Sequence, residues 1–286
     1  MGHLWLGQFL YFCLKTKFRQ TMRKLINPKY SHLSGLFDVL MNTDYFESEG
    51  ILLYDVGRNV IKRFQWEGED LVIKRFGHIT FFNRLMYSTV RKSKAMRAYK
   101  NASRLRAMGI STPEEIAVIE IYSHGILTES YFVSAYISNS SLSYLWEFTY
   151  EKKEWFPLLD SLVAWIAEIH DKGILHQDLN VGNILYQEQH DGSINFQLID
   201  INRMKFRTNL SVEERLKELS RLSTNLDLHL YLLRKYAELM KYDGNQIETK
   251  GCFYKIMFEF RQTIKRKIKG YLSSSFKRYC NGEIPR

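Results

Sequence analysis

Three side chains at fixed spacing carry the clearest chemical signal in this sequence: Asp178, Asn183 and Asp200. The first two lie in the segment His176–Asn183, and Asp200 ends the apolar run that follows. An aspartate can orient or deprotonate an attacking hydroxyl, while an asparagine and a second aspartate can hold the magnesium ion that bridges nucleotide phosphates. Magnesium needs only a few protein oxygens besides phosphate and water. The spacing therefore predicts phosphoryl transfer, with Asp178 catalytic and Asn183 and Asp200 as metal ligands.

The residues before this motif are rich in predicted strands. Apolar runs separated by turn residues predict an antiparallel meander and two further strands, over Gly50–Tyr54, Asn59–Phe64, Asp70–Phe76, Ile116–Tyr122 and Tyr131–Ile137. Helix-forming residues from Arg91 to Met108 predict one helix between them, stopped by Gly109.

From Tyr144 onward the pattern is mostly helical. Apolar residues recur at helical spacing over Leu158–Lys172, and Gly173 ends that helix next to the motif. The runs 184–186 and 196–199 predict a hairpin, and residues 212–277 predict further helices. We therefore expect an α+β, bilobal fold, with a basic helical extension over 1–45, a small antiparallel-sheet lobe over 46–137 and a larger helical lobe over 138–286.

The net charge of +10 favours an anionic partner such as nucleic acid, acidic lipid or a phosphorylated sugar, although simple solubility explains it equally well. A nucleic-acid partner is not expected, because the sequence has no finger spacing, RNA-binding motif or basic tail. The three cysteines have no metal-binding spacing and predict free thiols. The apolar run Leu4–Leu14 is too short to span a bilayer, so it either lies on a membrane surface or packs on the domain.

Five segments resemble the protein-kinase-like superfamily: Leu71–Phe76, Arg97–Ala102, Gly109–Pro113, His176–Leu185 and Leu198–Arg203. They are most similar to the lipopolysaccharide kinase family, which phosphorylates Kdo or heptose sugars of the lipid A–core region. The resemblance implies a bilobal kinase fold, a bacterial ATP- and Mg²⁺-dependent enzyme, and an anionic Kdo–lipid A type glycolipid as substrate. It also implies a cytoplasmic protein that is peripheral on the inner face of the cytoplasmic membrane.

The resemblance assigns the phosphate contacts to the strand-rich lobe. Lys74 would reach the α- and β-phosphates, with Arg75 and Lys62 as rival cations. The turn containing Gly57 and Arg58 stands where kinases have a glycine-rich loop, and it would bring backbone N–H groups and one positive charge to the nucleotide. With a single glycine, its signal in the sequence is weak.

The remaining assignments concern the acceptor and the adenine. Asn180 stands where protein kinases carry a lysine, which implies a catalytic contact with the acceptor or the γ-phosphate. Ala135 and Tyr136 would offer backbone groups to adenine, and Leu185 would form the floor of its pocket, unless these residues are ordinary core. His176 is expected to be structural and to bond backbone near the second aspartate.

Two departures from protein kinases matter. Asp200 is followed by Ile201-Asn202-Arg203 and soon by a helical pattern, so there is little room for a platform that binds peptides. The second departure is that no acid occurs between Leu71 and Pro113, where active kinases place a helix glutamate that pairs with the strand lysine. Either the pair is dispensed with, or an acid from elsewhere, such as Glu114, Glu115 or Glu120, replaces it.

The same stretch contains ten cations, which suit an anionic surface or substrate when no acids are interspersed. The basic aromatic segments Phe12–Arg23 and Ile264–Tyr279 also suit an anionic membrane. We therefore expect a sugar kinase of lipopolysaccharide synthesis. Two alternatives stay open: a non-catalytic kinase-like module that binds a membrane or a partner, and a kinase for another small-molecule or protein hydroxyl.

Overall fold

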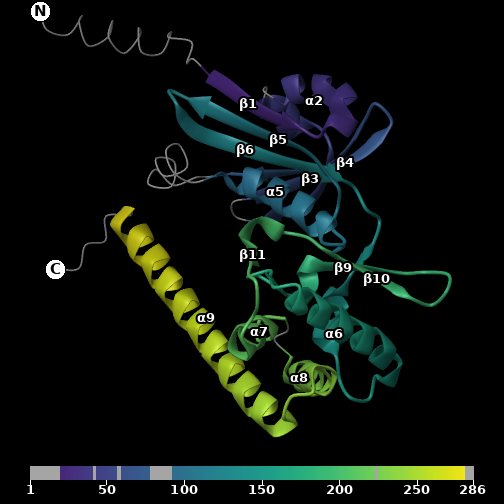
Figure 1. Ribbon diagram of the computed structural model, residues 1–286. Helices are drawn as coiled ribbons and strands as arrows, with labels where there is room; N and C mark the ends of the chain where they lie inside the picture. Colours follow the sequence, from purple (N-terminus) through teal and green to yellow (C-terminus); the bar gives the residue numbers. More distant parts are fainter. Residues whose placement is uncertain (1–19, 41–42, 57–58, 78–91, 223–224, 281–286) are drawn as a thin grey trace, which may run out of the picture. The chain divides into compact units, whose positions relative to one another are not determined.

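The computed structural model of the protein describes residues 20–40, 43–56, 59–77, 92–222 and 225–280. These residues form two compact units. The sheet unit contains the described residues up to 107 together with 112–138, and the helical unit contains 108–111 and the residues from 139 onward. The first is built on an antiparallel sheet and the second is mostly helical (Figure 1), so the α+β fold class is confirmed.

Six antiparallel strands make up the sheet. Their order across it is β1 (Gln20–Ile26), β5 (Glu115–Ser123), β6 (Ile126–Ala135), β4 (Glu69–Phe76), β3 (Asn59–Trp66) and β2 (Ile51–Val56). The meander predicted from the sequence is confirmed, because β2 pairs with β3 and β3 with β4. The β3–β4 turn consists of Glu67 and Gly68, both with positive φ, which is the geometry favoured in two-residue hairpins.

The expectation of a helical extension over residues 1–45 is wrong for Gln20–Ile26. This segment forms β1 and pairs with β5 along its whole length, and Met22 and Ile26 pack against the core. Sheet pairing overrides the local composition here, as is common for strands. Helical turns follow in η1 (Pro28–Leu33), α2 (Ser34–Val39) and α3 (Thr43–Ser48). The apolar run 4–14 lies outside the described residues.

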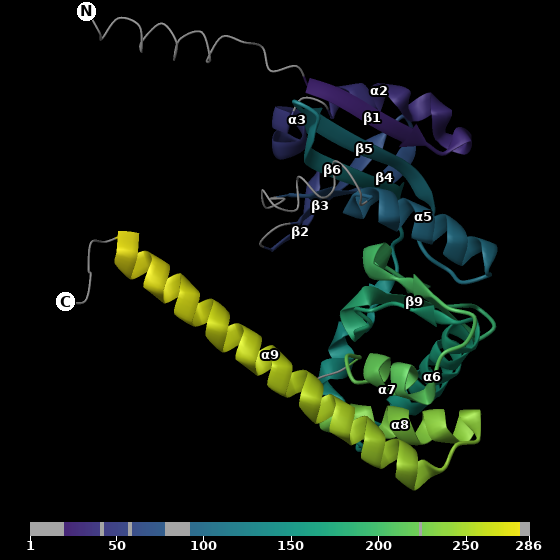
Figure 2. The same cartoon turned by 60° about the vertical axis from the view of Figure 1, so that its left-hand side comes forward.

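The two faces of the sheet have different covers. Successive side chains of a strand point to opposite faces, so Leu71 and Ile73 of β4 share one face while Lys74 and Phe76 share the other. Leu71 and Ile73 belong to the larger core, with residues of α2 and α3. Phe76 packs with Ala95 of α5 (Lys94–Ala107), which lies across the sheet from α2 and α3 (Figure 2).

The helical unit contains short strands and turns between its helices. In chain order its elements are β7 (Ser140–Ser141), η2 (Leu142–Glu147), η3 (Lys153–Trp155), α6 (Phe156–Asp171), β8 (Ile174–Leu175), η4 (Val181–Asn183), β9 (Ile184–Glu188), β10 (Ile194–Leu198), η5 (Ile201–Arg203), β11 (Lys205–Phe206), α7 (Val212–Leu219), α8 (Leu226–Met240) and α9 (Gly244–Cys280). The predicted hairpin is confirmed as β9 and β10. None of the helices in the described part of the chain combines the length and apolar character of a membrane span.

Helix α6 delivers the chain to the motif. Its apolar stripe is buried, and Gly173 then adopts a φ of 71° to leave the helix. A Cβ at this position would lie 2.0 Å from the carbonyl oxygen of Arg207, so only glycine fits. Strand β8 follows at once and pairs with β11. The residues after Asp200 are thus used in a short turn and a two-residue strand before α7 begins, which agrees with the absence of a long loop.

Candidate active site

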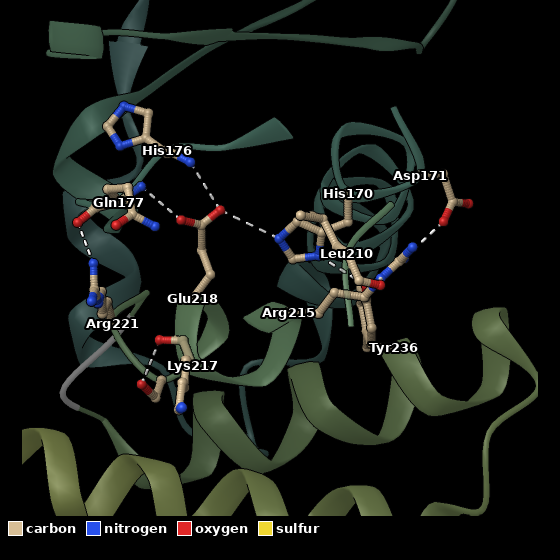
Figure 3. A network of polar contacts seen from close by, with 11 residues as sticks. His170, Asp171, His176, Gln177, Leu210, Arg215, Lys217, Glu218, Arg221 and Tyr236 are labelled. Atoms are coloured by element: carbon tan, nitrogen blue, oxygen red, sulfur yellow. Dashed lines mark hydrogen bonds and ion pairs between the residues drawn. The ribbon is translucent and has the colours of Figure 1, made fainter. Parts of the chain in front are cut away.

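The backbone of the motif loop is held by one buried carboxylate, that of Glu218 on α7 (Figure 3). The N–H of His176 donates to Glu218 Oε2 at 3.0 Å, and the N–H of Gln177 donates to Oε1 at 2.7 Å. His170 of α6 brings its Nε2 within 3.4 Å of Oε2. The Glu218 side chain is only 2% exposed, so these three groups replace its water contacts.

Burial by itself raises the pKa of Glu218, but His170 and the two backbone N–H groups outweigh it, and the pKa lies below its usual value. The carboxylate is therefore charged, and it acts as a fixed acceptor for the loop. A hydrogen bond of 2.8 Å joins His170 Nδ1 to the Tyr236 hydroxyl, to which Arg215 also donates at 3.1 Å. The network that holds the Glu218 carboxylate in place thus includes side chains from α6, α7 and α8.

Gln177 has a left-handed backbone, with φ of 68°. A non-glycine residue pays a strain cost there, and it keeps that conformation only when its surroundings enforce it. Here Glu218 binds its N–H, and Arg221 Nη1 donates to its carbonyl oxygen. Side chains from α7 and the residues just after it therefore set the direction in which the chain enters Asp178.

The loop closes on the carbonyl oxygen of Asp178. Asn180 Nδ2 donates to this oxygen at 3.0 Å and Asn183 Nδ2 at 2.9 Å. The Asn180 Oδ1 atom accepts from the N–H of Gly182 at 2.9 Å. Both ends of the Asn180 amide are thus bonded to the loop backbone, which is a structural role. Its contact with the acceptor or the γ-phosphate stays a prediction.

Ile199 ties Asp200 to this loop. Its N–H donates to the carbonyl of Asn183 at 3.0 Å, and its carbonyl lies 2.8 Å from His176 Nε2. The expectation that His176 bonds backbone near the second aspartate is confirmed. Asp200 itself has a left-handed φ of 55°, and its Oδ1 accepts from Asn202 Nδ2 at 2.5 Å. Its carboxylate is thus oriented at the point where the chain leaves β10.

The donor set fits magnesium in chemical type. Because the Nδ2 of Asn183 is used by the loop, its Oδ1 is the atom that would bind a metal, together with a carboxylate oxygen of Asp200. Within the described residues no group of three His, Cys, Asp or Glu side chains forms a metal site on its own. Nucleotide phosphates and water would therefore complete the coordination of an ion held here.

Asp178 is accessible, with 42% of its side chain exposed. Arg203 of η5 lies 3.3 Å from its Oδ2 and is more exposed still. A carboxylate in this setting can receive a hydroxyl from solvent, and the neighbouring guanidinium adds positive charge at the point of entry.

In the sheet unit the structure separates Lys74 from its rivals. Lys62 Nζ is buried and donates to three carbonyls at the end of α3, those of Phe46, Glu47 and Glu49, at 2.7–3.0 Å. Arg75 Nη1 lies 2.6 Å from Glu47 Oε1. Lys62 and Arg75 thus both bind groups on the face of the sheet that α3 covers.

Lys74 lies on the opposite face, which α5 covers, with its Nζ 5.3 Å from the centre of the Phe76 ring. The three acids considered as partners for it have other neighbours. Arg106 of α5 lies 2.9 Å from Glu114 and 3.5 Å from Glu115, and Glu120 accepts from the Tyr122 hydroxyl at 2.9 Å.

The assignments for the rest of the nucleotide site remain predictions. Gly57 and Arg58 lie outside the described residues. The N–H of Ala135 donates to the backbone carbonyl of Glu114, and the N–H of Tyr136 donates to the backbone carbonyl of Asp70. Neither N–H is therefore available to adenine. Only their carbonyls keep the predicted role. Leu185 lies on β9, the central strand of a three-stranded sheet, and is half-buried.

With this geometry established, comparison with known proteins identifies the family. The family model described as "Lipopolysaccharide kinase (Kdo/WaaP) family" matches residues 55–242. The chain belongs to the lipopolysaccharide kinase family. It is therefore a kinase, and membership in a kinase family implies the use of ATP. No curated protein sequence gives a significant match.

Among solved structures, the chain is similar to "WaaP in complex with acyl carrier protein", with a TM-score of 0.53 and 15% identity. The match covers 85% of this chain and 98% of that one. At this identity it shows a shared fold, which agrees with the expected kinase-like architecture. Because 1272 solved chains match significantly, the fold alone does not specify the acceptor.

Sequence reasoning missed the residues that position the loop, above all Glu218, Arg221 and Asn202. The available signal was weak: Glu218 precedes Leu219 on the buried side of a short amphipathic helix, where an acid is unexpected. Nothing in the local sequence says that this acid reaches His176, which lies 42 positions away.

Proposed function

We propose that this lipopolysaccharide-family kinase transfers the γ-phosphate of ATP, with Mg²⁺, to a sugar hydroxyl of Kdo or heptose in a lipopolysaccharide precursor. The observation that carries the proposal is the anchored loop, in which hydrogen bonds to Glu218 and Ile199 hold Asp178, Asn183 and Asp200 on adjoining backbone. Three functional groups on so constrained a backbone suit a reaction that depends mainly on positioning and charge stabilisation.

Each residue has a distinct role in this proposal. Asp178 accepts a hydrogen bond from the acceptor hydroxyl and orients it for in-line attack. Asn183 and Asp200 would hold the magnesium ion, which neutralises charge on the phosphate oxygens when it is bound. Lys74 would pair with the α- and β-phosphates. Arg203, beside Asp178, adds positive charge near an anionic acceptor.

The proposed partners follow from the substrate class. Lipopolysaccharide precursors are anionic glycolipids, so we place the protein at the cytoplasmic face of the membrane as a peripheral protein, in keeping with its charge of +10. The solved neighbour is in complex with acyl carrier protein, and a carrier protein is a second partner to test for this chain.

Labelled ATP and a set of acceptors test the proposal. Kdo-bearing and heptose-bearing lipid precursors are incubated separately with the protein, and mass spectrometry locates the added phosphate. Asp178→Asn and Asp200→Asn should each lower transfer by about 10²–10⁴-fold with the fold retained. Asp191→Asn, at an exposed hairpin tip where the carboxylate accepts hydrogen bonds from Ser193, is the matched control and should leave transfer unchanged. Full activity in either site variant would refute the mechanism.

One observation favours a second candidate, a kinase-like module without catalysis: helix α5 has no acidic residue. Nucleotide binding that persists without loss of the γ-phosphate, in the presence of every acceptor tested, would support this alternative.

A further inference from the structure

Helix α9 has two apolar faces, of which only one is used within the protein. Its N-terminal half packs along α7 and α8. Ile247 and Gly251 lie on this inner face, and a Cβ at Gly251 would come within 2.4 Å of the Leu233 side chain of α8. The inner face is thus closely packed, and it explains why this part of the helix is apolar.

The second face consists of five large apolar residues that are exposed: Phe253, Ile256, Phe260, Ile264 and Ile268. Their exposed fractions range from 40% to 66%. At about 100° per residue they fall within an arc of about 120°, opposite Ile247 and Gly251. They form a stripe about 22 Å long. Such a set on one helix face calls for a covering partner.

The charge around the stripe indicates which partner. Residues 260–280 contain seven cations and no acid. Among them, Arg261, Lys265, Arg266 and Lys267 are exposed. At about 100° per residue, Lys267 falls within the arc of the apolar residues and Arg261 falls next to it. Bulky apolar residues on one helix face with lysine and arginine around them are the composition of helices that lie in the interface of an anionic bilayer.

We propose that the exposed face of α9 docks the protein on an anionic membrane, with the Phe253–Ile268 stripe among the headgroups and the basic residues on anionic lipid. The proposal rests on the proposed function, since it supplies the contact that a kinase for membrane lipid needs. Figures 1 and 2 show that the C-terminal half of α9 extends beyond α7 and α8.

A second copy of the chain is a poorer occupant of the stripe. Pairing two α9 helices through this face would bring the cations of both copies together, with no acid in residues 260–280 to offset them. A bilayer containing acidic lipid covers the apolar residues and neutralises the cations at the same time.

Vesicle co-sedimentation of the full-length protein tests the proposal. Vesicles of phosphatidylglycerol and phosphatidylethanolamine are compared with vesicles of phosphatidylcholine. Ile256→Glu combined with Phe260→Glu should reduce binding to the anionic vesicles at least about 100-fold, because two apolar contacts are lost and two repulsive charges are added. Leu239→Glu, at an exposed apolar position of α8 outside the stripe, is the matched control and should bind like the unaltered protein.

The cations are tested separately. Lys267→Glu should weaken binding by on the order of tenfold, whereas Lys153→Glu, an exposed lysine elsewhere in the helical unit, should change it little. Equal binding to neutral and anionic vesicles, or unchanged binding in the double variant with its fold intact, would overturn the proposal. So would self-association, or binding of a purified acidic carrier protein, that is lost in the double variant while vesicle binding is not.

Catalysis provides an independent readout. The double variant should phosphorylate a delipidated, soluble acceptor at the unaltered rate, and Asp178→Asn should bind vesicles normally. Loss of vesicle binding in the stripe variant without loss of soluble turnover supports the docking role. If no acceptor is phosphorylated by any variant, the proposed function fails, while the vesicle result still decides the role of α9.

Discussion

The motif loop and strand β4 both present side chains of the proposed site, but they are held in different ways. The loop takes its shape from side chains distant in sequence, chiefly Glu218, which binds two consecutive backbone N–H groups. Strand β4 is fixed by pairing with β3 and β6 along its length. Loss of one anchoring side chain should therefore disturb the loop severely. Strand β4 should tolerate the loss of a side chain unless that side chain itself binds a ligand or a buried group.

The largest expected effect is that of Glu218→Gln. An amide offers a single acceptor oxygen where the carboxylate serves two N–H groups and His170, so a buried donor loses its partner. We expect destabilisation of about 3–5 kcal/mol and loss of phosphate transfer by about 100-fold or more. Urea unfolding and kcat measure the two effects.

Glu213→Gln is the control on the same helix. This acid pairs with Lys217 at the surface and should change stability by less than about 1 kcal/mol. Equal behaviour of the two variants would show that the loop does not depend on its buried anchor.

The next effect separates neighbouring cations of the sheet. Lys74→Met should lower kcat/KM for ATP by about 100-fold, because the side chain is proposed to bind the phosphates. Lys62→Met should leave kcat/KM for ATP nearly unchanged but destabilise the fold by about 2–3 kcal/mol, since three carbonyls at the end of α3 lose their donor. Steady-state kinetics and urea unfolding of both variants distinguish them. A fall in ATP use for Lys62→Met alone would reverse the assignment.

A third prediction compares the two units by pH. Burial lowers the pKa of His229, which lies on α8 and contacts Gly251 of α9, from 6.5 to about 4. The unfolded chain therefore binds a proton at His229 more readily than the folded protein does. The folded protein is thus more stable above pH 6.5, and this stability is lost as the pH falls toward 4. The α8–α9 contact should therefore weaken by up to about 3 kcal/mol in this range. Hydrogen exchange of α8 and α9 at pH 7.5 and 5 measures it, and His229→Gln should remove the pH dependence.

The smallest effect is expected in the sheet unit. Partial burial raises the pKa of Glu114, but hydrogen bonds from Lys29, Tyr30 and Arg106 outweigh it and lower the pKa to about 2. The stabilisation is present above pH 4.5 and is lost as the pH falls toward 2. Strands β1 and β5 should thus keep their protection at pH 5, where α8 and α9 have begun to lose theirs. Glu114→Gln should cost about 1 kcal/mol at pH 7, measured by urea unfolding.

Much of the fold could be predicted because its signals are local. The five short strands, helix α6 with its glycine stop and the β9–β10 hairpin follow from periodicity and turn residues, which depend on neighbouring positions only. Asp178, Asn183 and Asp200 could be proposed for the same reason: their spacing along one stretch of chain is typical of phosphoryl transfer. Strand β1 was missed because its identity depends on pairing with β5, about a hundred residues away.

The sequence by itself predicted most of the elements from β2 onward, the three candidate site residues and the family. Only the tertiary structure decided that Lys62 and Arg75 serve α3 while Lys74 lies on the face of α5, since a strand pattern does not say which helix covers each face. It alone decided that Glu218 anchors the loop and that α9 keeps a second apolar face exposed. These features depend on contacts between distant segments, and local composition does not encode which distant groups will meet.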